Sequence, residues 1–188
     1  MKLREKKPAL LLVDLQVGFN EEEYWGGNRN NKDAEEVCAT ILKEWRKLKL
    51  PIIHVIHSSQ NSESKLHESH PGFAFQEVTK PIEDEPVLIK NVNSAFIGTG
   101  LKERLESQGI DTVVIIGLTT NHCISTTTRM SGNLGFNTYL ISDATATFDR
   151  IGINGERYDS EIIHMTTLAS LHEEFATVMS ADDLLAQI

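Results

Sequence analysis

The stretch Thr112-Val-Val-Ile-Ile-Gly-Leu-Thr-Thr-Asn-His-Cys123 joins a continuous apolar run to a short polar segment that ends on a cysteine. Residues 112–117 have the pattern of a parallel strand that is buried on both faces. Each of residues 119–121 is a suitable N-cap for a helix that follows. Cys123 is therefore predicted to lie in the first turn of a helix, just beyond the carboxyl end of a central strand.

A cysteine in this position has two interpretations. The unpaired N–H groups and the positive end of the helix dipole favour a thiolate and can hold a developing oxyanion. The helix that follows contains Ile124 and three consecutive threonines, which are poor helix formers, and such local inconsistencies gather at functional sites. Free cysteine is also among the most buried residue types, so composition alone favours a structural role for Cys123.

Apolar and amphipathic runs alternate along the rest of the chain. The predicted strands are 9–13, 51–56, 86–89, 112–117, 137–142 and 176–179. The predicted helices are 32–48, 99–107, 121–133, roughly 157–171 and a C-terminal segment. Strands separated by helices predict an α/β fold, in which helices cover both faces of a six-stranded parallel sheet through right-handed crossovers. With 188 residues and no linker-like segment, the chain is predicted to form one domain over residues 1–188.

Composition narrows the class of partner. The formal net charge of -9 argues against a nucleic-acid partner or an anionic membrane surface, because both require clustered Lys and Arg. The charged N-terminus is followed by only a short apolar run, so neither a signal peptide nor a membrane span is expected. The two cysteines, Cys38 and Cys123, do not suggest a zinc site or a disulfide framework. A cytoplasmic protein that acts on a small molecule is the expectation.

Chemically active side chains follow three of the predicted strands. Asp14 follows the first strand, Lys90 follows the third and Cys123 follows the fourth. The carboxyl ends of parallel strands meet at one edge of a sheet, and ligands bind there near the point where strand order reverses. A carboxylate, an ammonium and a thiol provide a base, a stabilising charge and a nucleophile for covalent catalysis. Taken singly, Asp14 also suits a helix cap or metal ligand, and Lys90 a solvated strand end.

Short motifs in a fixed order carry a family resemblance. They are Leu11-Leu-Val-Asp14-Leu-Gln16 with Phe19, Lys90 with Ser94-Ala-Phe96 and Gly98-Thr-Gly-Leu101, Gly117-Leu-Thr-Thr-Asn-His-Cys123 with Arg129, and Ile141-Ser-Asp143-Ala144. Each motif is weakly specific. Together, over nearly the whole chain, they resemble those of the isochorismatase-like cysteine hydrolases, which include nicotinamidases and N-carbamoylsarcosine amidases.

The resemblance implies a Rossmann-like fold with strand order 3-2-1-4-5-6 and a catalytic triad of Asp14, Lys90 and Cys123. It also implies a cis peptide bond between Leu118 and Thr119, which directs the backbone N–H groups of Thr119 and Cys123 into an oxyanion hole. Because members of the family are commonly oligomeric, a homo-oligomer, either a dimer or a tetramer, is expected.

The implied reaction is hydrolysis of a small amide, lactam, ureido or carbamoyl compound through a thioester. Asp14 accepts the thiol proton, Lys90 favours the ionised pair, and Cys123 attacks the carbonyl carbon. The helix dipole and the Asp14–Lys90 pair are expected to lower the thiol pKa from its ordinary value of about 8.5. Two alternatives stay open: an isochorismatase-type hydrolase of an enol ether, whose members lack the cysteine, and a non-catalytic binding or scaffold domain.

Neither a metal nor another cofactor is predicted. Nicotinamidase-like members carry an Asp-x-His metal motif, whereas here the second strand reads His54-Val-Ile-His57 with no Asp in reach. His54 and His57 face opposite sides of a strand and cannot chelate one ion together. His67 and His70 could meet on a helical turn, but a histidine pair in a polar loop is more often solvated.

The substrate pocket is the least defined part of the prediction. Residues 58–86 form a long polar segment, and such loops in compact domains are usually functional or contact another subunit. Within it, His70-Pro-Gly-Phe-Ala-Phe75 is the candidate lid or subunit arm. Aromatic rings commonly line small-molecule sites, although core packing explains each of these rings equally well. The candidate substrate contacts are Phe19, Trp25, Phe96 and His122.

Overall fold

The central strands form from aliphatic runs that are buried on both faces. In a computed structural model, which describes residues 2–188, every residue of β1 (Ala9–Val13) is buried. Leu10 and Leu12 pack into one core cluster, and Leu11 and Val13 into a second. Successive side chains of a strand point to opposite faces, so a continuous apolar run supplies two cores. Met1, the first residue of the predicted domain, lies outside the described residues.

Six parallel strands form the main sheet, in the order β3-β2-β1-β4-β5-β8. The strands that join β1 in this sheet are β2 (Ile52–His57), β3 (Val87–Lys90), β4 (Thr112–Leu118), β5 (Asn137–Ala146) and β8 (Thr177–Met179). Counted along the chain, β8 is the sixth strand of this sheet. The predicted fold class and the predicted order 3-2-1-4-5-6 are therefore confirmed.

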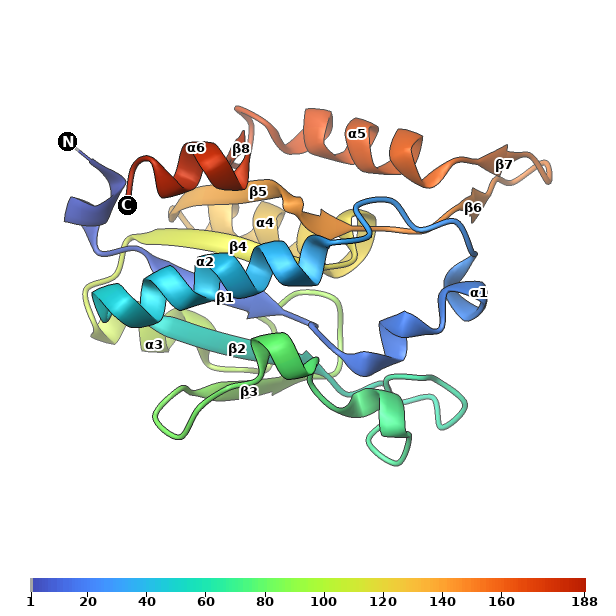
Figure 1. The fold of residues 1–188 in the computed structure, drawn as a ribbon, viewed down its shortest axis with the longest axis horizontal. Helices are drawn as coiled ribbons and strands as arrows, with labels where there is room; N and C mark the ends of the chain where they lie inside the picture. The colour runs from blue at the N-terminus through green and yellow to red at the C-terminus, as the bar shows by residue number, and fades with distance from the viewer. Residues whose placement is uncertain (1) are drawn as a thin grey trace.

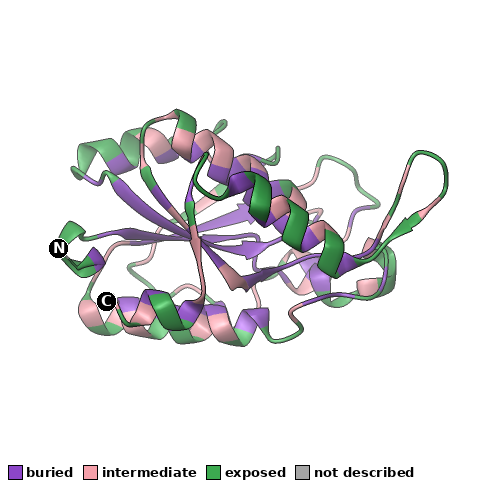
Figure 2. Ribbon diagram, turned by 90° about the horizontal axis from the view of Figure 1, so that it is seen from above, coloured by how far each residue is buried: buried purple, intermediate pink, exposed green. Residues whose placement is uncertain are grey.

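Helices cover both faces of the sheet (Figures 1 and 2). They are α2 (Ala34–Leu48), α3 (Leu101–Ser107), α4 (Ser125–Asn133), α5 (Ser160–Leu171) and α6 (Ala181–Leu185), whereas the short α1 (Glu22–Trp25) buries no residue and lies away from the strands. Helices α2 and α6 pack into one core cluster, and α3 and α5 into the other. Short 3₁₀ turns are η1 (Leu3–Lys6), η2 (Val17–Asn20), η3 (Pro71–Phe73) and η4 (Glu77–Thr79). None of the helices formed by residues 2–188 is long and apolar enough to cross a membrane.

Two segments differ from the expected elements. The helix predicted for residues 121–133 is divided into a π-helical turn, η5 (Thr120–Ile124), and α4. The helix predicted to begin near residue 157 begins at Ser160, where the Asp159 side chain accepts from Glu161 N–H. The preceding residues form an antiparallel hairpin, β6 (Arg150–Ile151) and β7 (Arg157–Tyr158), which projects from one end of the molecule (Figure 1). Strands of two residues are too short to show a period in the sequence.

The strand order reverses between β1 and β4, which are neighbours at the centre of the sheet. Gly117 in β4 has a φ of +125°, and a Cβ atom there would overlap the carbonyl oxygen of Val13. The backbones of the two strands therefore approach closely at their carboxyl ends. In an open α/β sheet this switch point is the expected place for a ligand.

Candidate active site

Asp14 and Lys90 meet at this switch point, although they come from strands that are not adjacent. Asp14 follows β1, and its N–H donates to the carbonyl of Val55 at 2.8 Å. Lys90 is the last residue of β3, which lies at the edge of the sheet beyond β2. Its long side chain reaches past β2, so that Nζ lies 2.7 Å from Asp14 Oδ2, and both side chains are fully buried.

Cys123 joins this pair from η5. Its Sγ lies 3.2 Å from Lys90 Nζ, and Cys123 itself is 8% exposed. The structure thus brings Asp14, Lys90 and Cys123 together around one ammonium group. Their shared catalytic role stays a prediction, whereas their proximity is a property of the fold.

The environment of Cys123 raises the pKa of its thiol well above the ordinary value. Burial is the largest cause, the Asp14 carboxylate adds to it, and Lys90 acts in the opposite direction. The direction is contrary to the lowered pKa that the helix terminus and the Asp14–Lys90 pair led us to expect. Burial decides the sign, because removing a thiolate from water costs more than one neighbouring ammonium returns. The resting group is therefore a thiol, which needs a base when it reacts.

Asp14 is placed to be that base. Neither of its carboxylate oxygens accepts a well-directed hydrogen bond from the described residues, despite the close approach of Lys90. Acceptor atoms of Asp14 and Cys123 lie within 4.8 Å of one another. A buried carboxylate with free acceptor capacity beside a thiol can take the thiol proton.

His57, the last residue of β2, is a site residue that the sequence argument did not include. Its Nδ1 lies 2.8 Å from Lys90 Nζ. Burial, and then the charge of Lys90, lower the pKa of His57, while Asp14 acts weakly in the opposite sense. His54 faces the other side of the strand, where its Nε2 contacts Glu85 at 2.8 Å. The sequence feature that could have identified His57 is its place at the end of a strand, at the same sheet edge as Asp14.

Asp14, His57 and Cys123 resemble a metal-ligand set, since their donor atoms lie within 4.8 Å of one another. The Lys90 ammonium, however, lies 2.7 Å from Asp14 Oδ2, 2.8 Å from His57 Nδ1 and 3.2 Å from Cys123 Sγ. A divalent cation among these atoms would stand against a positive charge at contact distance. The three residues therefore fit a lysine ammonium rather than a metal ion.

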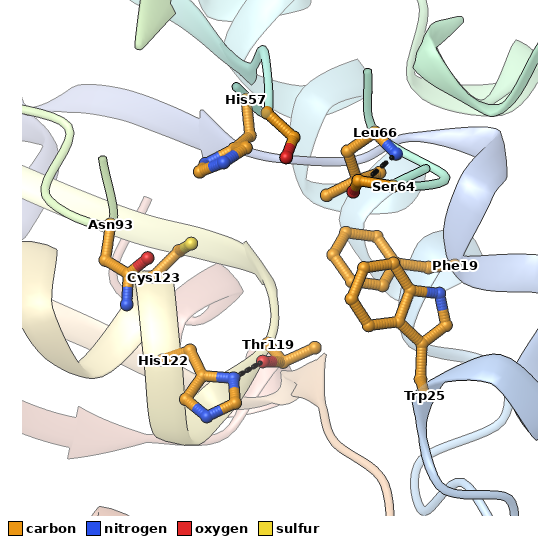
Figure 3. A pocket seen from close by; sticks show the side chains of 10 residues that line it. Phe19, Trp25, His57, Ser64, Leu66, Asn93, Thr119, His122 and Cys123 are labelled. Carbon is orange, nitrogen blue, oxygen red and sulfur yellow. Dashed lines mark hydrogen bonds between the residues drawn. The ribbon is translucent and has the colours of Figure 1, made fainter. Parts of the chain in front are cut away.

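A cavity of about 330 Å³ opens beside Cys123. Figure 3 shows Phe19 and Trp25 on one side of it, opposite Cys123 and His122, with His57 above. The rings of Phe19 and Trp25 are 4.8 Å apart, so two of the predicted aromatic contacts share one wall. The remaining lining residues are Ser59, Ser64, Leu66, Asn93 and Thr119.

Phe96 is not among the residues that line this cavity, and its role as a substrate contact stays a prediction. Its ring stacks on Phe136 with centroids 5.8 Å apart, against the core cluster that α3 and α5 cover. From the long polar segment, Ser59, Ser64 and Leu66 line the cavity, whereas residues 70–75 do not, and the role of residues 70–75 as a lid or subunit arm stays a prediction. Backbone atoms of the 70–75 segment are instead bonded to the chain that follows β1, through Val17 N–H and Ala74 carbonyl at 2.8 Å.

Thr119 and His122 lie at the edge of the cavity that η5 forms. The peptide bond between Leu118 and Thr119 is cis, and the Thr119 carbonyl accepts from the N–H groups of His122 and Ile124. His122 Nδ1 lies 3.3 Å from Arg150 Nη2. Partial desolvation and then Arg150 lower the pKa of His122, so the mouth of the cavity presents a neutral imidazole. The oxyanion role of Thr119 and Cys123 N–H stays a prediction.

Comparisons with known proteins identify the family of this chain. A model of the isochorismatase domain matches residues 8–183. The isochorismatase family protein YrdC of Bacillus subtilis is 50% identical over 96% of this chain and 96% of its own length. Nicotinamidase 3 of Arabidopsis thaliana is 38% identical over 95% of this chain and 87% of its own. An isochorismatase-family crystal structure from Chromobacterium violaceum is 38% identical, covers 100% of this chain and 96% of its own, and superposes with a TM-score of 0.94. The chain therefore belongs to the isochorismatase family of hydrolases.

Proposed function

We propose that this hydrolase cleaves the C–N bond of a small amide, lactam, ureido or carbamoyl compound through a thioester on Cys123. The observation that carries the proposal is the Lys90 ammonium, which contacts Asp14 at 2.7 Å and Cys123 at 3.2 Å beside the cavity. The similarity to a protein named nicotinamidase supports the same bond class. A cavity of about 330 Å³ suits a small molecule rather than a polymer.

The reaction begins with the protonated thiol. Asp14 takes the Sγ proton while Sγ bonds to the carbonyl carbon, and the N–H groups of Thr119 and Cys123 hold the oxyanion. The C–N bond then breaks, and the nitrogen leaves with the proton from Asp14. Water attacks the thioester and gives one proton to Asp14. Collapse releases a carboxylic acid, and Asp14 returns that proton to the sulfur.

A hydrolysis assay over nicotinamide, a cyclic lactam, a ureido acid and an N-carbamoyl amino acid tests this proposal, read as ammonia release or, for the lactam, as formation of the ring-opened amino acid. Cys123→Ala is expected to lose on the order of 10³-fold or more in kcat, because no other thiol is near the substrate. Cys38→Ala is the matched control, since Cys38 is buried on α2 and its thiol donates to the Ala144 carbonyl. Mass spectrometry of a rapidly quenched reaction should detect an acyl group on the Cys123 peptide. Equal activity in both variants would refute the thioester mechanism.

Hydrolysis of an enol ether is the second candidate function. The raised pKa of Cys123 and the direct contact between Asp14 and Lys90 favour it, because an acid–base pair without a thiol nucleophile suffices for that chemistry. It predicts that Cys123→Ala retains hydrolysis of isochorismate, whereas Asp14→Asn loses it. Loss of isochorismate hydrolysis in both variants would exclude this candidate.

A further inference from the structure

The contact between Lys90 and His57 fixes the position of a proton. A lysine ammonium has three N–H donors and no acceptor, so His57 Nδ1 must accept in the 2.8 Å contact. The imidazole proton is then on Nε2. The same Nζ also contacts the Val92 carbonyl and Cys123 Sγ, each at 3.2 Å, so His57 is one of the groups that fix where the ammonium lies.

The backbone of His57 is held in place by Gln16, two residues after Asp14. His57 N–H donates to Gln16 Oε1 at 3.0 Å, and Gln16 Nε2 donates to the His57 carbonyl at 3.1 Å. Gln16 Nε2 also donates to the Phe73 carbonyl at 3.1 Å, and the Gln16 side chain is fully buried. This amide joins the ends of β1 and β2, so the ring of His57 projects from a fixed backbone.

Three groups face the His57 ring from the neighbouring elements. They are Lys90 from β3, Asp14 from the end of β1 and the Cys123 thiol from η5. Burial and the charge of Lys90 both lower the pKa of His57 and outweigh Asp14, which favours the neutral ring. A neutral ring with an unprotonated Nδ1 is the form that the Lys90 contact requires.

The His57 ring also borders the cavity. His57 lines the cavity together with Cys123 and Asn93 (Figure 3). Among residues 2–188, Nε2 is neither buried without a partner nor bonded to another protein group. The Nε2–H group is therefore a donor that the protein leaves available to a bound molecule.

We propose that His57 links Lys90 to the substrate: Nδ1 holds the Lys90 ammonium between Asp14 and Cys123, and Nε2–H donates to an oxygen acceptor of the substrate. The preferred substrates then carry such an oxygen, for example a second carbonyl or a carboxylate, close to the bond that is cleaved. The substrate half of this inference rests on the proposed function, whereas the Lys90 half does not.

Nitrogen-15 NMR of histidine-labelled protein tests the Lys90 half without a substrate. The His57 signals, assigned by their absence in His57→Gln, should show an unprotonated Nδ1 and a protonated Nε2 near neutral pH. Lys90→Met should shift the Nδ1 resonance, because its donor is removed. A proton on Nδ1, or a doubly protonated ring near neutral pH, would overturn the inference.

Kinetics on the best amide of the panel test the substrate half. His57→Leu should lower kcat/KM by about 10- to 100-fold, the range for losing a hydrogen bond to a charged or reacting group. His57→Gln keeps an acceptor and a donor and should recover most of this loss. The acidic limb of the wild-type pH profile should shift in His57→Gln but not in His67→Gln, the control at a half-buried position of a loop.

A His57→Leu variant with the wild-type pH profile and kcat/KM would overturn the substrate half. Recovery of activity in His57→Gln shows that a loss in His57→Leu does not come from misfolding. The NMR experiment needs no substrate. If no compound of the amide panel is hydrolysed, that result therefore counts against the proposed function alone. A His57 ring with its proton on Nδ1 counts only against the role inferred for His57.

Discussion

At the scale of single residues, Asp14 and Lys90 act in opposite directions on one thiol. Asp14 raises the pKa of Cys123 and Lys90 lowers it, on top of the larger effect of burial. Asp14→Asn should therefore lower the apparent pKa of Cys123, and Lys90→Met should raise it further. The pH dependence of iodoacetamide alkylation, read by peptide mass spectrometry, measures both shifts. Cys38, which is fully buried on α2, provides the internal reference.

The same experiment can contradict the electrostatic account. If Asp14→Asn and Lys90→Met shift the alkylation profile in the same direction, the two side chains do not oppose each other at the sulfur. If neither variant shifts it, burial alone sets the pKa of the thiol.

Gly117 is the second position where one residue decides the site. Its φ of +125° is strained for a residue with a side chain, and a Cβ would overlap Val13 carbonyl oxygen. Gly117→Ala should destabilise the protein by at least about 2 kcal/mol, since backbone strain and overpacking each cost about 1–3 kcal/mol. The midpoint of urea unfolding measures this loss.

Gly135→Ala is the matched control for Gly117. Its φ is also positive, at +87°, but no heavy atom lies within 4 Å of the added Cβ. It should lose less stability than Gly117→Ala. Equal losses in the two variants would show that backbone strain, and not the approach of β4 to β1, sets the requirement for glycine.

At the scale of elements, η5 and α4 show why poor helix formers are tolerated beside Cys123. Thr120 Oγ1 contacts His164 Nδ1 at 2.9 Å and Thr145 Oγ1 at 3.1 Å. Thr127 Oγ1 accepts from the Ala95 N–H at 3.0 Å, which ties α4 to the loop that follows β3. These threonines lose a few tenths of a kcal/mol in helix propensity and make tertiary hydrogen bonds that better helix formers cannot make.

Thr127→Val tests that explanation, because valine keeps the shape and removes the acceptor. The buried Ala95 N–H would then lack its partner, which should cost about 1–3 kcal/mol. The urea midpoint should fall without a change in the m-value. Thr126→Val, at a half-buried position of the same helix, is the control and should change stability by less. A loss in Thr126→Val as large as in Thr127→Val would assign the effect to the helix rather than to this bond.

At the scale of the whole molecule, the stability should fall in acid because several histidines are held neutral. Burial is the first cause that lowers the pKa of His54, His57 and His164 in the folded protein. The unfolded chain therefore binds more protons below a pH of about 6.5, the ordinary histidine value. This stability is present above that pH and is lost as the pH falls toward the folded-state pKa values.

The expected slope is up to about 1.4 kcal/mol per pH unit for each such histidine. Urea unfolding at a series of pH values measures it. His164→Gln should reduce the slope, because it removes one of these histidines. A free energy of unfolding that rises as the pH falls would contradict the direction of these shifts.

The expected homo-oligomer stays a prediction at this scale. Several large apolar side chains on the β6–β7 hairpin and α5 are exposed: Ile151, Ile153, Ile162 and Met165. Exposed apolar patches often mark contacts with other chains. Light scattering should give a mass of two or four times the 21.0 kDa chain. A mass equal to one chain would contradict the expectation.

The sequence by itself determined the architecture and part of the site. A short continuous apolar run is typical of a strand that is buried on both faces. The runs at 9–13 and 112–117 form β1 and β4. The carboxyl ends of parallel strands share one edge, and this placed Asp14 and Cys123 near each other. Both results depend on local periodicity, which the sequence records directly.

Only the tertiary structure decided how these residues interact. Lys90 reaches Asp14 by passing β2, and His57 joins it because β2 lies between their strands. Phe96 stacks on Phe136, and burial raises the pKa of Cys123, whereas its place at a helix terminus predicted a lowered pKa. Side-chain reach and desolvation are set by packing between segments distant in the sequence, and no local pattern encodes them.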